Sequence, residues 1–401
     1  MTVLHLVAYR VLPYPGGLQE SVMRIGGSLA EAGYRVIVYT LHQPDGYRFP
    51  DPSHQGLTVV HLGGRELLLE PYHEKEHPDL RAAEAGRVAA LLLRNAVDEQ
   101  KRNCPDARHA IISFYASGTG FLAQMVALSL GLPHIASVRG TDFELEVFDS
   151  KKHPKLRAAI EGATQVVTTN REQAEGLSAL FQVRQPIRTI HNALLQAASR
   201  RLWEAPPADT VRLISDCGFS GRKATHLLLR AAAALMDRGL PVSLTVLGKA
   251  FWLESQTYWE ECRRSYEARY PGKFSFPGQV SHEELDRYLL SAHIYCSASL
   301  AEGSSMSRIR ALTIGIPVVT TANGGLEELV SGCRHVRLCR AGDWEALATE
   351  LETAVAAARA GTLQPDREYV ERWRRHFSVE RERQEWICAI EAALGAERVR
   401  V

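Results

Sequence analysis

Short apolar runs and amphipathic stretches alternate from the first residues of the chain. Residues 2–8 and 35–40 are apolar and rich in β-branched side chains, whereas 18–32 carry apolar positions at helical spacing. A helical pattern between two such runs predicts a βαβ unit with buried, parallel strands. The alternation continues, with strands expected at 57–62, 110–114, 134–138, 163–169 and 187–191 and helices at 78–97, 118–129 and 171–180. Between them, 43–78 is polar and irregular, which predicts mainly a surface loop.

A second series of strands and helices begins after a polar run. Residues 193–207 are poor in apolar side chains and contain Pro206 and Pro207, so we place a domain boundary there. Ser281 and Glu284 form a predicted capping box at one helix start. Beyond the boundary, strands are expected at 211–215, 242–248 and 274–280, and helices from 223 and at 254–270, 343–358 and 379–394.

The composition agrees with two domains and limits the function classes. A chain of 401 residues normally exceeds one hydrophobic core, and 47 basic against 46 acidic residues give a formal charge of +1, so no global charge points to nucleic acid or an anionic membrane. The stretch 118–132 contains Gln124 and is too short to span a bilayer, and the N-terminus lacks the basic start of a signal peptide. Seven cysteines without a CxxC pair indicate reduced thiols in a cytoplasmic protein, and no His or Cys cluster has metal-ligand spacing.

The stretch 297–328 carries the most informative pattern. It contains, in order, Glu302, Gly303, Ser304, Ser305, a helical run to Gly315 and an apolar strand at 317–321. Either serine can cap the helix, and the glycine suits a left-handed helix end. The N–H groups at the helix start can hold a phosphate, and the nearby carboxylate can bind sugar hydroxyls. The alternative is an ordinary βαβ crossover whose small residues only make a tight turn.

This stretch resembles the nucleotide-sugar site of retaining glycosyltransferases with the two-domain GT-B fold, a family that includes sucrose synthases and bacterial mannosyl- and N-acetylglucosaminyltransferases. Their usual pattern is Glu-Gly, a second Glu eight residues after the first, Ala, a Gly-x-Pro-Val-Val strand, then Gly-Gly and another Glu. The order is followed here by Glu302, Gly303, Ala311, Gly315, Pro317, Val318, Val319, Gly324, Gly325 and Glu328. The second Glu of the Glu-x7-Glu pair is replaced by Arg310.

The resemblance implies an α/β fold of the GT-B type, with two Rossmann-like, doubly wound parallel-sheet domains and a cleft between them. It implies an acceptor-side domain at 1–195, a donor-binding domain at 208–375, and a C-terminal helix at 376–401 that crosses back to the first domain. The implied reaction moves a sugar from a nucleotide-diphosphate donor to a hydroxyl or amine acceptor, with retention of anomeric configuration. It needs neither a metal ion nor a cofactor.

The resemblance also implies the donor-binding residues. Gly16 and Gly17 stand where the family's first loop approaches the donor phosphate, although a Gly-Gly pair after Pro15 is by itself more often a plain turn. Arg222 and Lys223 stand near the family's diphosphate-neutralising Arg and Lys, where preformed cations stabilise the leaving group. The expected donor site also includes Gly303, Ser304, Ser305, Met306, Arg310 and Glu328.

Arg139 and Asp142 follow the strand expected at 134–138, and ligands gather at the carboxyl ends of parallel strands. A branch of the family has Arg-Gly-x-Asp at this place. The resemblance implies that Arg139 acts on the donor phosphate or sugar, and that Asp142 binds an acceptor hydroxyl or orients the arginine. A purely structural Arg–Asp pair is the alternative. With Glu302 and Lys223, these two residues complete the expected catalytic set.

Arg310 departs from the family's pattern. In the family the missing Glu binds the ribose hydroxyls, a contact that an arginine cannot copy because it has no acceptor lone pair. Another carboxylate, such as Glu327 or Glu328, can hold the ribose while Arg310 binds a phosphate. Alternatively the donor carries an extra phosphate or lacks a ribose, or the protein is a catalytically weak relative.

Other function classes stay open at this point. They are a pseudo-glycosyltransferase, a sugar phosphorylase, a transferase with an unusual phosphorylated donor, and a non-catalytic GT-B partner protein. Retained Glu302 and Lys223 argue against the last, and the lack of G-x-G-x-x-G after either opening strand argues against a dehydrogenase. The acceptor can be a small molecule, a glycan or a peptide, and a homodimer is one arrangement compatible with the sequence.

Overall fold

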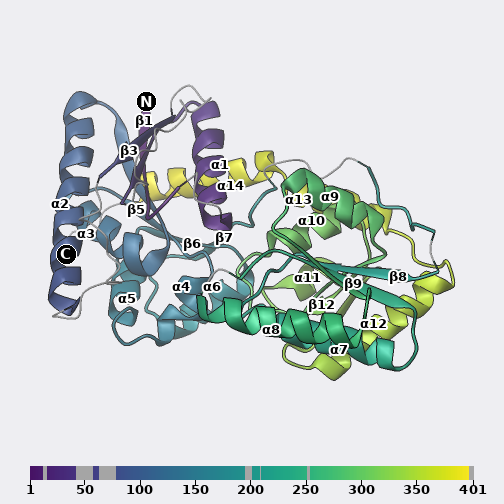
Figure 1. The fold of residues 1–401 in the computed structure, drawn as a ribbon. Helices are drawn as coiled ribbons and strands as arrows, with labels where there is room; N and C mark the ends of the chain where they lie inside the picture. The colour runs from purple at the N-terminus through teal and green to yellow at the C-terminus, as the bar shows by residue number, and fades with distance from the viewer. Residues whose placement is uncertain are drawn as a thin grey trace. The chain divides into compact units, whose positions relative to one another are not determined.

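The computed structural model describes residues 1–11, 16–41, 57–62, 78–194, 201–207, 209–250 and 253–396. The chain divides into two compact units, Met1–Leu195 with Val379–Val401, and Gln196–Ser378. Each unit contains a parallel sheet with helices on both faces (Figure 1), which confirms the predicted α/β class. Most of the loop expected at 43–78, and part of the run at 193–207, lie outside the described residues.

The first unit contains a seven-stranded sheet in the order β3-β2-β1-β4-β5-β6-β7. The order of strands reverses between β1 and β4, and open parallel sheets bind ligands at the carboxyl ends of strands near such a point. The strands are β1 (Thr2–Ala8), β2 (Arg35–Thr40), β3 (Leu57–His61), β4 (Arg108–Phe114), β5 (His134–Ser137), β6 (Gln165–Thr168) and β7 (Arg188–Thr189).

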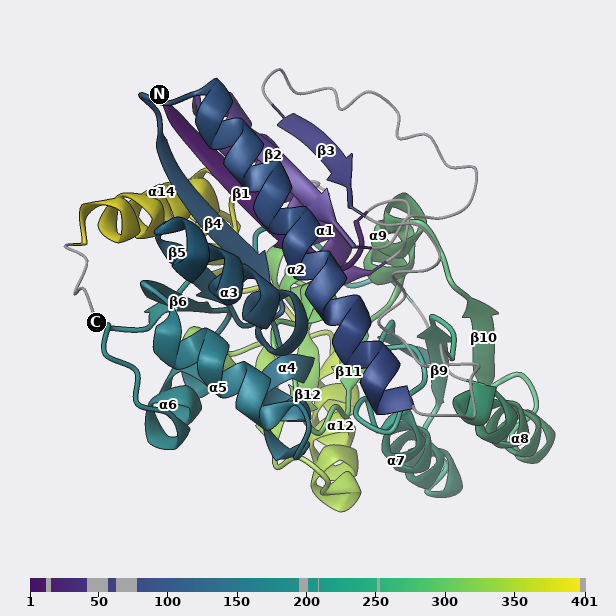
Figure 2. The same ribbon diagram turned by 90° about the vertical axis from the view of Figure 1, so that its left-hand side faces the viewer.

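Helices cover both faces of this sheet (Figure 2). Because side chains alternate along a strand, Leu4 and Leu6 pack with α1 and α14, whereas Val3 and Val7 pack with α2 and α3. The last helix of the chain therefore contributes to the core of the first unit. The helical elements are α1 (Gly17–Glu31), α2 (Pro78–Asn103), η2 (Ala116–Gly120), α3 (Phe121–Leu130), α4 (Thr141–Glu144), η3 (Glu146–Phe148), α5 (His153–Gly162), α6 (Arg171–Leu180) and α14 (Val379–Gly395).

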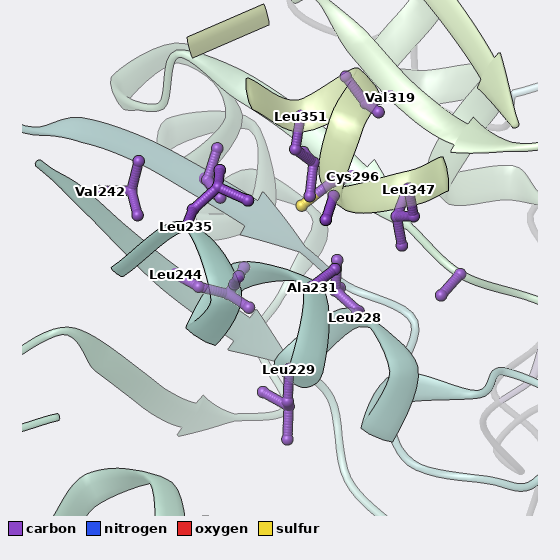
Figure 3. Packing of buried hydrophobic residues seen from close by; sticks show 14 of the residues in the cluster. Leu228, Leu229, Ala231, Leu235, Val242, Leu244, Cys296, Val319, Leu347 and Leu351 are labelled. Atoms are coloured by element: carbon purple, nitrogen blue, oxygen red, sulfur yellow. The ribbon is translucent and has the colours of Figure 1, made fainter. Parts of the chain in front are cut away.

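The second unit contains a six-stranded sheet in the order β10-β9-β8-β11-β12-β13. The strands are β8 (Val211–Ser215), β9 (Val242–Leu247), β10 (Phe274–Gly278), β11 (Ile294–Ser297), β12 (Val318–Thr321) and β13 (Val336–Cys339). The helices are α7 (Thr225–Asp237), α8 (Leu253–Arg269), α9 (His282–Ser291), α10 (Met306–Ile314), α11 (Leu326–Val330), α12 (Trp344–Arg359) and α13 (Arg367–His376). Leucines of α7 and α12 pack over the sheet in the core shown in Figure 3.

Many predicted elements are confirmed. β1, β2, β8 and α6 have the predicted bounds, and Ser281 with Glu284 makes both hydrogen bonds of the capping box. The helix expected at 78–97 extends to Asn103, since the polar residues that follow 97 still favour helix. Gly315 ends α10 in the left-handed conformation, with φ +86°, as expected.

Two predictions beside the first sheet are confirmed only in part. The helix expected at 118–129 begins as a π-turn, η2, and continues as α3, and the strand expected at 187–191 is only the two-residue β7. Tyr115, just before the π-turn, has φ +86°, which is uncommon for a residue with a side chain. Irregular backbone of this kind often accompanies functional sites.

Among the described helices, none is long and apolar enough to cross a membrane.

Candidate functional site

Three neighbouring strands of the second unit, β8, β11 and β12, place their carboxyl-terminal loops together. The loops are 216–224, 298–305 and 322–325. The Leu300 N–H donates to the Arg222 carbonyl at 2.8 Å, which joins the first loop to the second. The Asn323 side-chain amide donates to the Ser299 carbonyl at 2.7 Å, which joins the second loop to the third. The three loops therefore form one surface at the strand ends.

An ion pair between Lys223 and Glu302 lies on this surface. The Nζ–Oε1 distance is 2.7 Å, and the side chains are 22% and 5% exposed. Burial alone would raise the pKa of Glu302, but the Lys223 ammonium and the Arg308 guanidinium outweigh it and lower this pKa to about 2. Glu302 is therefore ionised at neutral pH and can only accept hydrogen bonds. The structure thus brings together two residues of the expected catalytic set.

Gly324 lets the third loop approach Glu302 closely. It has φ +65°, and a Cβ atom at this position would stand 2.6 Å from the Glu302 carbonyl oxygen. Arg308 donates from Nη1 to the Thr321 carbonyl at 3.3 Å and so links α10 to the same loop. Gly324, the first glycine of the predicted Gly-Gly pair, is therefore needed for this close packing.

The start of α10 is not capped by a side chain. Ser305 is the N-cap residue with extended backbone, but its hydroxyl makes no capping hydrogen bond, so the expectation of a serine cap is wrong for this residue. Ser304, Ser305 and Met306 are all partly exposed. The first N–H groups of a helix lack intrahelical partners and carry the positive end of its dipole, so this start is suited to an anion.

Asp216 supports the same helix start and was missed by the sequence reasoning. Its carboxylate accepts from the Tyr295 hydroxyl at 3.1 Å and also bonds the Ser307 side chain in the first turn of α10. Burial raises the pKa of Asp216, while the bonds from Ser307 and Tyr295 oppose this shift. An acid directly after a buried strand, β8, was the available signal.

Ala224 occupies a strained position between Lys223 and α7. Its φ of +46° lies in the left-handed region, and the residue is fully buried. Left-handed backbone favours glycine, so an alanine at this position is strained. Lys223 thus precedes α7, rather than starting the helix as predicted, and its N–H donates to the Ser220 carbonyl at 3.1 Å.

The side chain of Arg310 is directed to the neighbouring helix α9. Its Nη1 donates to Asp286 Oδ1 at 2.7 Å, and its Nη2 contacts His282 Nδ1 at 3.1 Å. The Arg310 side chain is 5% exposed and that of Asp286 is 18% exposed. Arg310 is thus paired with a partly buried carboxylate, and its expected contact with a donor phosphate stays a prediction.

Two further predicted donor-site residues lie at the edge of this region. Gly303 is buried directly after Glu302, and Glu328 is exposed in the short helix α11. Glu327 is exposed beside it in the first turn. Both glutamates therefore remain accessible to a ligand.

In the first unit, Asp142 organises backbone. The side chain is 0% exposed and accepts from the N–H groups of Ala116 at 2.9 Å, Arg139 at 3.0 Å and Gly140 at 2.9 Å. Burial raises its pKa, and these hydrogen bonds oppose the shift. The carboxylate thus holds the ends of β4 and β5 together, and its expected contact with an acceptor hydroxyl stays a prediction.

Arg139 lies at the centre of a buried polar cluster. Its Nη2 donates to Asn192 Oδ1, which also accepts from Arg24 Nη2 at 3.4 Å. Arg24 in turn makes two bonds to Glu382 of α14, at 2.7 and 2.8 Å. Burial lowers the pKa of Arg139 to about 10, and Glu382 opposes this shift. Arg139 Nη1 is buried with no hydrogen-bond partner among the described residues, which makes it the atom of this cluster best placed for a ligand.

Arg24, Asn192 and Glu382 were not predicted as site residues. The available signals were an arginine on the buried face of α1 and a glutamate on that of α14. Gly16 and Gly17, which were predicted, lie at the start of α1, where Gly16 is the N-cap residue and no side chain caps the helix. Among the described residues, no group of three or more His, Cys, Asp or Glu side chains is arranged to hold a metal ion.

Comparisons with known proteins match both units. Residues 215–364 match the family model described as "Glycosyl transferases group 1", and residues 16–193 match the model described as "Glycosyl transferase 4-like domain". Mannosylfructose-phosphate synthase of Agrobacterium fabrum is 23% identical over 80% of this chain and 74% of its own length. WcaL of Escherichia coli K12, described as a colanic acid biosynthesis glycosyltransferase, is 27% identical, but the match spans only 36% of each chain.

Solved structures match the whole fold. The sucrose-phosphate synthase of Thermosynechococcus elongatus superposes with a TM-score of 0.76 at 18% identity, covering 99% of this chain and 100% of that one. HepE of Anabaena, solved in complex with UDP-glucose, gives 0.72 at 15% identity, covering 98% and 100%. At these identities the likeness shows the fold alone, and it confirms the predicted GT-B fold class.

Proposed function

We propose, from the premise that the chain belongs to the glycosyltransferase group 1 family, that it moves a sugar from a nucleoside-diphosphate donor to a hydroxyl or amine acceptor. We further propose retention at the anomeric carbon and no requirement for a metal ion. The observation that carries the proposal is the Lys223–Glu302 pair beside the uncapped start of α10. A diphosphate and a sugar ring require these features side by side: a cation, free backbone N–H groups and an ionised carboxylate.

In the proposed complex, the donor diphosphate lies on Lys223, Arg222 and the first turn of α10. Glu302 accepts hydrogen bonds from the sugar hydroxyls. When the bond between the anomeric carbon and the phosphate oxygen breaks, the electron pair stays on the diphosphate, whose negative charge grows. Preformed cations and helix-end N–H groups stabilise that charge without reorganising.

The acceptor attacks the anomeric carbon from the side that the diphosphate leaves, so the new bond keeps the original configuration. The proton of the acceptor hydroxyl or amine passes to the leaving phosphate oxygen. No side chain of the second-unit site needs to act as a nucleophile in this scheme. Excluding water during this step would limit hydrolysis of the donor.

The division of roles between the units is part of the proposal. We assign acceptor binding to the domain at 1–195 and donor binding to the domain at 208–375. We assign the helix within 376–401 the role of anchoring the end of the chain in the first unit. For Arg139, whose buried Nη1 has no hydrogen-bond partner among the described residues, we propose contact with the donor phosphate or sugar. Gly16 and Gly17 offer the open start of α1 to the same ligands.

Arg310 is assigned a supporting role. We propose that it fixes α9 against α10 through Asp286, and that an exposed carboxylate of α11, Glu327 or Glu328, binds the donor ribose. The neighbour structures with UDP and UDP-glucose make uridine the first base to test.

The test is thermal unfolding of the purified protein with nucleoside diphosphates, nucleotide sugars and sugar phosphates, because a ligand that binds the folded state raises the midpoint. We expect a shift with one nucleoside diphosphate and its sugar conjugate, and release of that diphosphate when an acceptor is added. Lys223→Gln should abolish the shift, while Lys273→Gln, which lies before β10 at the opposite end of the sheet, should keep it. A shift with sugar phosphates alone would contradict the proposal and favour a phosphorylase.

A further inference from the structure

A cavity lies in the first unit between the edge strand β7 and α14. Its volume is about 310 Å³, which places it at the lower end of the roughly 300–1,000 Å³ of ligand pockets. It equals roughly ten water molecules at their liquid volume, so it suits a molecule of about ten non-hydrogen atoms. Because Arg188, Gln384 and Cys388 are exposed, the cavity opens to solvent. The lining residues are Arg188, Thr189, Ile190, Gln384, Glu385 and Cys388.

The α14 side of the cavity carries a carboxylate with an unsatisfied oxygen. Glu385 Oε1 pairs with Arg381 Nη2 at 2.6 Å, whereas Glu385 Oε2 is buried with no hydrogen-bond partner among the described residues. A buried polar atom without a partner is costly and indicates a missing donor. Burial raises the pKa of Glu385, and the Arg381 charge opposes this shift. An ammonium group would supply both a donor and a compensating charge.

The β7 side of the cavity carries a cation and an apolar side chain. Arg188 is exposed, and its Nε donates to Gln165 Oε1 at 3.4 Å. A guanidinium group has five N–H donors, and two of them together match a carboxylate. Ile190 is only 2% exposed and belongs to the core that packs against α14. The cavity therefore combines an anion, a cation and an apolar surface.

We propose that this cavity binds a small zwitterion, namely an amino acid with an apolar side chain. Glu385 would accept from the ammonium group, Arg188 would donate to the carboxylate, and Ile190 would contact the side chain. A ligand with only one charge would leave either the carboxylate or the guanidinium of the cavity without a counter-charge. The zwitterion compensates both, which decides between the ligand classes.

Both sides of the cavity lead to the buried polar cluster around Arg139. Ile190 lies two residues before Asn192, whose Oδ1 accepts from Arg139 Nη2. Glu385 lies one helical turn after Glu382, the carboxylate at the other end of that cluster. A ligand that shifts either segment therefore shifts a member of the cluster. We infer that the cavity is an effector site for the transfer; this part rests on the proposed function, whereas the binding does not.

The thiol of Cys388, exposed in the lining, reports on the occupancy of the cavity. The experiment measures the rate at which iodoacetamide alkylates this thiol in the full chain, by mass spectrometry of its peptide. L-Leucine should slow the reaction in a saturable way, about threefold at twice its dissociation constant. Isoamylamine lacks the carboxylate of leucine and 4-methylpentanoate lacks its ammonium group, so both should protect less at equal concentration. Cys262 of α8, in the second unit, should react at an unchanged rate.

Two variants separate the roles of the charged residues. Glu385→Gln should weaken the protection by leucine at least about tenfold, because it removes a bond between charged groups. Arg188→Gln should remove the advantage of leucine over isoamylamine. Glu380→Gln, which changes an exposed carboxylate in the first turn of the same helix, is the matched control and should bind leucine like the wild type.

No protection by leucine, equal protection by the three compounds, or undiminished protection in Glu385→Gln would overturn the proposal. So would a Cys388 that fails to react in the free protein, because the cavity would then be covered. Titration with UDP, with and without leucine, separates the claims. Protection of Cys388 without UDP binding would support the cavity and contradict only the donor assignment, whereas UDP binding that leucine leaves unchanged would contradict only the effector role.

Discussion

Single residues decide whether the proposed donor site works, and Glu302 is the clearest case. Its carboxylate pairs with Lys223 at 2.7 Å. A bound donor would give Lys223 a phosphate and leave the carboxylate to the sugar. The ion pair therefore compensates two opposite charges at a partly buried position. We expect donor binding to separate the two side chains.

We predict that Glu302→Gln lowers the transfer rate by roughly 10- to 100-fold, the range expected for losing a hydrogen bond to a charged group. Initial rates of diphosphate release would measure this. Glu350→Gln, which alters a partly exposed pair with Arg337, should leave the rate unchanged. A Glu302→Gln enzyme as active as the wild type would contradict the sugar-binding role.

The Arg310–Asp286 pair gives a stability prediction. Arg310→Leu should lower the free energy of unfolding by roughly 2 kcal/mol, because it leaves a largely buried carboxylate unpaired. Replacing both residues by leucine should recover part of the loss. Urea unfolding measures both effects, and a neutral single variant would show that the pair contributes nothing.

Glu302 and Lys223 were selected as site residues because the motif around each resembles the family's pattern, which a linear sequence contains. The contacts that Arg310 and Asp142 make in the structure could not be predicted in this way. The partners of Arg310 lie 24 and 28 positions earlier, and Asp142 reaches back 26 positions to Ala116. Such pairings depend on how helices and strands pack, which a linear pattern does not contain.

Among the elements, β1 shows both the strength and the limit of sequence reasoning. Its apolar run predicted the strand, yet His5 lies within it, 0% exposed. His5 bonds Tyr39 at 3.2 Å and His109 at 3.0 Å. Burial, and then the charge of His109, lower the pKa of His5 to about 3. The π-turn η2 was equally unpredictable, because it depends on the tertiary bond from Ala116 to Asp142.

These buried histidines predict a loss of stability in acid. Burial also lowers the pKa of His134 to about 3, so His5 and His134 are neutral in the folded state and gain a proton on unfolding below their ordinary pKa of 6.5. Their contribution is complete above about pH 6.5 and is lost as the pH falls toward 3. Each should cost about 1 kcal/mol between pH 7.5 and 5.5. The slope of the free energy of unfolding against pH counts the protons gained on unfolding. Urea unfolding at several pH values should give His134→Gln a slope that is smaller than that of the wild type by the equivalent of about one proton. An unchanged slope would contradict the assignment.

The last helix gives a further prediction at this scale. Trp386 of α14 is fully buried in the first-unit core beside Phe114. Trp386→Ala should lower the free energy of unfolding by about 3 kcal/mol or more. Trp344→Ala, on the partly exposed start of α12, is the control and should cost less. Equal losses would mean that α14 adds little to the core.

For the whole molecule, alternating strands and helices were enough to predict two parallel α/β units, and comparison with solved structures confirms the GT-B class. Donor and acceptor do not follow from the fold, since the relatives named above differ in their substrates. The contacts of Asp216 and Asn192, two loop residues beside the candidate site residues, became visible only in three dimensions.

The most direct test of the central claim is calorimetric titration of the protein with UDP and the other nucleoside diphosphates. The account predicts saturable binding of one of them without added metal, weakened at least about tenfold in Lys223→Gln and unchanged in Lys273→Gln. Binding that survives Lys223→Gln, or no binding of any nucleoside diphosphate, would contradict the proposed donor site.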